Sequence, residues 1–73
     1  MDAPTIERLV RGVATDFAWP VDFVSAVASD RWWEIVVEDT ARGRALTFWI
    51  YDGKPAAMRS AIHDRLEALL ESS

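Results

Sequence analysis

The chain has 73 residues, no cysteine and a formal net charge of −4, and 51% of its residues are hydrophobic. This length predicts a single domain over residues 1–73, and a chain without cysteine forms neither disulfides nor zinc–thiolate sites. The acidic balance argues against nonspecific nucleic-acid binding, in which Lys and Arg neutralise phosphates. No apolar run reaches the ~20 residues of a membrane span. The N-terminus lacks the basic and apolar parts of a secretory signal, so we expect a cytoplasmic location.

The first expected element is a helix from about Pro4 to Ala18. Proline suits a first helical turn, and Trp19-Pro20 ends the pattern because the residue before proline favours extended geometry. Gly12 lies off the apolar stripe and either permits a close approach or is simply tolerated. The apolar residues recur at helical spacing: Ile6, Leu9, Val10, Val13 and Phe17.

Three strands are expected next. The first, Val21 to Ala28, alternates too weakly to show its inward face. Ser29-Asp30 predicts a tight hairpin to the second strand, Arg31 to Glu38. A longer turn, Asp39 to Gly43, leads to the third strand, Arg44 to Tyr51.

Asp52-Gly53-Lys54-Pro55 predicts the start of the last helix, capped by Asp52 or a neighbour. Arg65 falls inside its apolar stripe, so we expect either a stem that reaches water or a partner carboxylate such as Asp16 or Asp22. The stripe itself is made of Met58, Ala61, Ile62, Leu66, Leu69 and Leu70.

This order predicts an α+β fold, α-β-β-β-α, because short connections make the strands an antiparallel meander. Both helical stripes need cover, so both helices should pack on one sheet face. The residues expected beneath them alternate along the last two strands: Trp33, Ile35, Leu46, Phe48 and Ile50.

The opposite sheet face is the predicted binding surface. A chain this short has helices for one face only, and contiguous exposed aromatics usually mark a contact surface. Two registers remain open, with Trp32 opposite either Trp49 or Tyr51. The residues expected on this surface are Trp32, Glu34, Val36, Glu38, Thr47, Trp49 and Tyr51.

The sequence offers no catalytic, metal or cofactor site. His63 has Ser60 and Glu67 at helical spacing, but a surface helix supplies no oxyanion hole. A single histidine without cysteine does not build a typical zinc site. Glu34 and Glu38 lie about 13 Å apart along a strand, farther than a glycosidase pair. We therefore expect no enzyme and no cofactor.

The element order resembles the topology of double-stranded-RNA-binding domains over the whole chain. Those domains carry a lysine cluster at the start of the last helix and a longer loop after the first strand. Here the segment Gly53 to Ala57 has one lysine, and the loop is Ser29-Asp30. The residues that contact RNA are missing, so the RNA-binding activity is not expected.

We expect a small non-catalytic protein-binding module, of adaptor or inhibitor type, that contacts a protein partner or a second copy of itself. Seven of the eight basic residues are Arg, a hint of GC-rich coding in a bacterium or phage. One alternative is therefore a phage-encoded inhibitor of a nucleic-acid-handling or defence complex that acts through an acidic surface. Another is a nucleic-acid binder that stacks bases on Trp32, Trp49 and Tyr51, although Glu34 and Glu38 repel phosphate.

Overall fold

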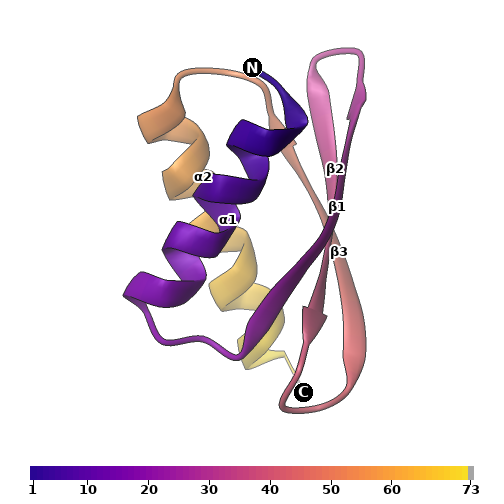
Figure 1. Cartoon of the computed structure of the whole chain (residues 1–73), viewed down its shortest axis with the longest axis vertical. Coiled ribbons are helices and arrows are strands. Elements are labelled where there is room, and N and C mark those ends of the chain that lie inside the picture. Colours follow the sequence, from indigo (N-terminus) through magenta and orange to yellow (C-terminus); the bar gives the residue numbers. More distant parts are fainter. Residues whose placement is uncertain (73) are drawn as a thin grey trace.

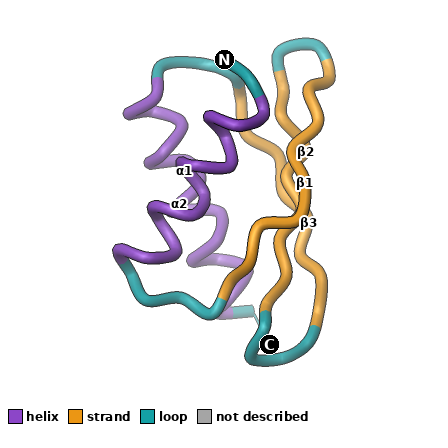
Figure 2. Tube along the Cα trace, viewed as in Figure 1, coloured by secondary structure: helices purple, strands orange, loops and turns teal. Residues whose placement is uncertain are grey.

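A computed structural model describes residues 1–72 and confirms the α-β-β-β-α order. The elements are α1 (Ala3–Asp16), β1 (Val21–Ser29), β2 (Trp32–Asp39), β3 (Arg44–Tyr51) and α2 (Pro55–Glu71). The strands form one antiparallel sheet in the order β1-β2-β3. Both helices lie on the same face of this sheet (Figure 1), so the molecule has one helical layer and one strand layer (Figure 2).

The core lies between these two layers. α1 packs mainly against β1, α2 packs against β3, and the two helices contact each other. The five residues predicted beneath the helices are all buried, which confirms the inner face of the sheet. The remaining large apolar side chains that are buried come from both helices and β2: Ile6, Val10, Val13, Val37, Met58, Ile62 and Leu66.

α1 begins with a side-chain cap. The Asp2 Oδ1 accepts hydrogen bonds from the Thr5 N–H at 3.0 Å and from the Thr5 Oγ1 at 2.6 Å. These bonds favour the ionised carboxylate and lower the pKa of Asp2 below its ordinary value. Asp2 therefore satisfies one of the main-chain N–H groups that a helix start leaves unpaired.

α1 ends two residues before the predicted boundary, in a backbone turn centred on Ala18. Ala18 has φ +53°, its N–H donates to the Thr15 carbonyl at 3.2 Å, and the Trp19 N–H donates to the Ala14 carbonyl at 2.9 Å. This pair of bonds is a Schellman motif, in which the left-handed position is usually glycine. Ala18 therefore carries a steric cost that glycine would not.

The prediction that Phe17 belongs to the buried stripe of α1 was wrong. Phe17 follows the helix and is 47% exposed. Its ring stacks on Trp19, with the centroids 5.2 Å apart, and meets the His63 ring at 4.5 Å. The helix ends before Phe17, so this side chain leaves the helical face and packs on the α1–β1 connection and α2.

β1 contains a bulge at Val24, which explains its weak alternation. Phe23 lies opposite the buried Val37, but after the bulge it is Ala26 that lies opposite Ile35. One extra residue in a strand shifts the alternation by one position. The inward face therefore changes from the odd to the even positions within β1.

A buried carboxylate organises the β2–β3 turn. Asp39 has no exposed surface. Its Oδ1 accepts from the Ala41 and Arg42 N–H groups at 3.2 and 3.3 Å. Its Oδ2 accepts from Arg42 Nη1 at 3.1 Å and Arg44 Nε at 3.2 Å. The sequence placed Asp39 in a turn but gave no sign of this burial.

The start of α2 differs from the expectation. Lys54 occupies the N-cap position and makes no side-chain capping bond, while Pro55 begins the helix. Asp52 instead donates its main-chain N–H to the Arg31 carbonyl at 2.7 Å. The prediction that Asp52 or a neighbour caps this helix was therefore wrong, because Asp52 extends the β2–β3 ladder.

Candidate functional site

The candidate site is the sheet face opposite the helices, called here the outer face: Trp32, Glu34, Val36, Glu38, Thr47, Trp49 and Tyr51. The structure brings these residues together on β2 and β3. Trp32, Trp49 and Tyr51 are 48%, 47% and 49% exposed, whereas Glu34 and Val36 on the central strand are half-buried. Three half-exposed aromatic side chains therefore lie on one surface of a small domain.

The register places Trp32 opposite Tyr51, one of the two arrangements that the sequence left open. Their rings meet edge to face, with the centroids 5.1 Å apart. The Tyr51 hydroxyl accepts a hydrogen bond from Arg31 Nη1 at 3.3 Å. These contacts orient the two aromatic side chains against each other on the outer face.

Trp49 lies in the next row of the outer face, directly across from Glu34. Val27 of β1 lies on the other side of Glu34 and completes this row. Farther along, Asp22 lies opposite Glu38. The outer face therefore has an aromatic end beside the β1–β2 turn and an acidic end beside the β2–β3 turn.

Sequence reasoning missed the contribution of β1 to this surface. Val24 and Val27 are exposed large apolar residues, and Val27 belongs to the outer face by its pairing with Glu34. The bulge hid this pattern, because no single alternation runs through the whole strand. The exposed apolar area is therefore wider than the sequence predicted.

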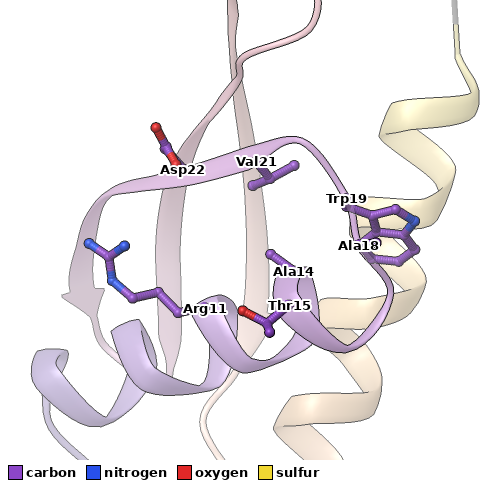
Figure 3. Close-up of a pocket in the computed structure, with 7 residues that line it drawn as sticks. All are labelled: Arg11, Ala14, Thr15, Ala18, Trp19, Val21 and Asp22. Atoms are coloured by element: carbon purple, nitrogen blue, oxygen red, sulfur yellow. The ribbon is translucent and has the colours of Figure 1, made fainter.

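A hollow of about 440 Å³ lies at the corner of α1 and β1. Arg11 and Thr15 line it from α1 and Asp22 from β1, and Asp22 points outward, away from Thr15 (Figure 3). Arg11 is held by Glu7, with Nε to Oε2 at 2.8 Å, and lies over the Phe23 ring.

His63 lies on α2 within the aromatic cluster that includes Phe17 and Trp19. Its ring stacks on Trp19 at 5.2 Å. Its Nδ1 is 3.0 Å from an Asp64 oxygen, and its Nε2 is 3.9 Å from Glu67 Oε2. These contacts fit a packed surface histidine, and its lack of a catalytic role stays a prediction.

Within residues 1–72, no group of three or more His, Cys, Asp or Glu side chains is arranged to hold a metal ion. Neither helix in this part of the chain combines the length and the hydropathy needed to cross a membrane.

The comparisons with known proteins add no relative: no family model, curated protein or solved structure matches this chain.

Proposed function

We propose that this protein is a small, non-catalytic protein-binding module of the cytoplasm that acts by occupying a partner through its outer face. The observation that carries this proposal is the cluster of half-exposed aromatic side chains at Trp32, Trp49 and Tyr51. Aromatic residues at the centre of an interface commonly dominate its binding energy. A domain of this size also has a thin stability margin, which a partner on that face would raise.

The charge around the aromatic residues favours a protein over a nucleic acid as the partner. Glu34 lies directly across from Trp49, and Asp22 lies opposite Glu38 on the same side. Carboxylates beside the rings repel a phosphate backbone. The same surface suits a second copy of the chain or a partner with basic residues near the acidic end.

The test combines a substitution with a cross-linking measurement. Trp49→Glu should weaken association by about 2 kcal/mol or more while the monomer still folds. Phe17→Ala is the matched control, because Phe17 is as exposed as Trp49 but lies at the α1–β1 connection. Sedimentation velocity over a range of concentrations reports self-association, and circular dichroism reports the fold.

For a different partner, a photo-cross-linking amino acid replaces Val36, at the centre of the outer face, or Phe17 in the control. We expect position 36 to capture a defined protein, or a second copy of the chain, that position 17 does not capture. A strictly monomeric parent with the same cross-links from both positions would rule out the outer face as the binding surface.

A further inference from the structure

A groove follows the free edge of β3, between this strand and α2. β3 pairs with β2 on one side and is the last strand of the sheet on the other. Two hollows of about 150 and 370 Å³ lie along this free edge. Trp49 and Arg65 line both hollows, so the hollows adjoin and form one groove.

The main chain of β3 offers hydrogen bonds to this groove. The Asp52 N–H donates to the Arg31 carbonyl, which makes this pair a hydrogen-bonded rung of the β2–β3 ladder. Bonded and non-bonded rungs alternate in an antiparallel pair. This alternation directs the N–H and C=O groups of Thr47, Trp49 and Tyr51 toward the free edge.

On the α2 side of the groove, Arg65 lines both hollows between two small residues, whereas Asp64 lines only the hollow beside Tyr51. Ala61, Arg65 and Ala68 are spaced four and three residues apart, which places them on one helical face. Arg65 is exposed, and within residues 1–72 no carboxylate lies within 4 Å of its guanidinium. Asp16, one of its expected partners, pairs with Arg59 instead.

We infer that an extended segment of a protein partner binds in this groove as a fourth strand along β3, with an Asp or Glu side chain on Arg65. An added strand uses the unpaired main-chain groups of an edge. Its inward side chains recur about every 7 Å, close to the ~6 Å between Ala61 and Arg65 along the helix. The segment therefore carries small apolar residues on either side of its acidic residue. This inference rests on the proposed protein-binding function.

A second copy of the chain fits the groove poorly. A symmetric pairing of β3 with β3 centred on Trp49 would place the Arg65 side chains of both copies in the same groove, which is unfavourable for like charges. Pairing of β3 with the β1 edge would direct no carboxylate toward Arg65, because Asp22, the one acidic residue of β1, lies on the outer face opposite Glu38. It would also be a head-to-tail contact, which closes into a ring or continues into a filament rather than forming a two-fold dimer. A different protein with an acidic strand is therefore the better occupant.

The test uses synthetic heptapeptides with blocked ends. The probe is TVTETVT, whose glutamate lies on the same side of an extended strand as its two valines. TVTKTVT is the charge control, and TVTETVT with alternate amides N-methylated removes main-chain donors. Nuclear magnetic resonance titration of the ¹⁵N-labelled protein should shift the amides of Thr47, Trp49 and Tyr51. The glutamate peptide should bind about fivefold more tightly than the lysine peptide, and the methylated peptide should not bind.

Two variants of the groove and one control variant on the same helix test the edge site. Arg65→Glu should reverse the preference toward TVTKTVT, and Ala68→Trp should block every peptide, whereas Ser60→Trp on the same helix should not. Equal affinity for the two charged peptides, shifts confined to β1, or no shifts at all would overturn the inference. If position 36 still captures a partner in that case, the proposed function stands without the added strand. If that capture fails as well, both fail.

Discussion

Asp39 and Arg44 face each other at the last rung of the β2–β3 ladder, and the Arg44 Nε lies 3.2 Å from the buried Asp39 Oδ2. The same arginine donates from Nη2 to the carbonyl groups of Leu69 and Ser72 at 3.3 and 3.2 Å. These bonds satisfy acceptors at the end of α2 that have no partner within the helix. One ion pair therefore joins the turn, the edge strand and the last helix.

Replacing Asp39 with Asn should lower the free energy of unfolding markedly at neutral pH. Burial alone would raise the pKa of the Asp39 carboxyl, but the hydrogen bonds from Arg42 and Arg44 outweigh it and hold the pKa below the ordinary 3.8. A lowered folded-state pKa stabilises the fold above the unfolded-state pKa, and this contribution is lost as pH falls through the folded value. Urea unfolding at several pH values measures the free energy of unfolding of parent and variant. The difference between these two free energies should shrink below about pH 4. A constant difference down to pH 2 would contradict this role.

Phe48→Ala should cost about 3–5 kcal/mol of unfolding free energy, because it removes a large side chain from the centre of the core. That loss is comparable to the whole stability of a domain this small. Phe17→Ala makes the same chemical change at an exposed position and should cost only about 0.5–1.5 kcal/mol from lost ring contacts. Thermal unfolding followed by circular dichroism compares the two variants. Equal melting temperatures would contradict the assigned core.

Gly12→Ala and Ala18→Gly should both stabilise the protein. A Cβ at Gly12 meets no atom within 4 Å, so alanine should add about 1 kcal/mol through helix propensity. Ala18 has φ +53°, and glycine there should relieve about 0.5–1 kcal/mol. Gly43→Ala is the control of opposite sign, because Gly43 has φ +65°. Melting temperatures that fall for either of the first two variants would show that these backbone arguments fail.

His63→Ala should weaken the fold slightly and leave partner binding intact. Because the His63 ring contacts Phe17 and Trp19, its removal should lower the free energy of unfolding by about 0.5–1.5 kcal/mol. His63→Phe keeps an aromatic ring and should retain most of the stability that His63→Ala loses. Chemical unfolding measures the stability, and cross-linking from position 36 measures the binding. Loss of the cross-link with an intact fold would show that His63 contributes to function.

The sequence was sufficient for the layers of the fold but not for the details that depend on tertiary contacts. Alternation in β2 and β3 separated the buried Phe48 from the exposed Trp49, because each strand keeps one phase throughout. The inward side of β1 could not be predicted, since the bulge at Val24 changes that phase. The exposure of Phe17 depends on a backbone turn at Ala18. Glycine is the usual sequence signal for such a turn, and this position is an alanine.

The candidate site shows the same division. Alternation predicted its exposed aromatic residues. The pairing of Trp32 with Tyr51 depends on the length of the β2–β3 turn, and the sequence was compatible with two turn lengths. The role assigned to Arg65 follows from its position beside the edge of β3. A helical pattern shows that this arginine interrupts an apolar stripe, but not which strand lies next to it.

The bulge at Val24 also bears on how the chain could change in evolution. Insertions and deletions are usually tolerated in exposed loops, yet here the extra residue lies inside a strand. Losing Val24 would give β1 a single uninterrupted phase and turn either Phe23 or Ala26 away from the helices. A descendant chain shortened by this one residue would therefore need compensating changes along half of β1.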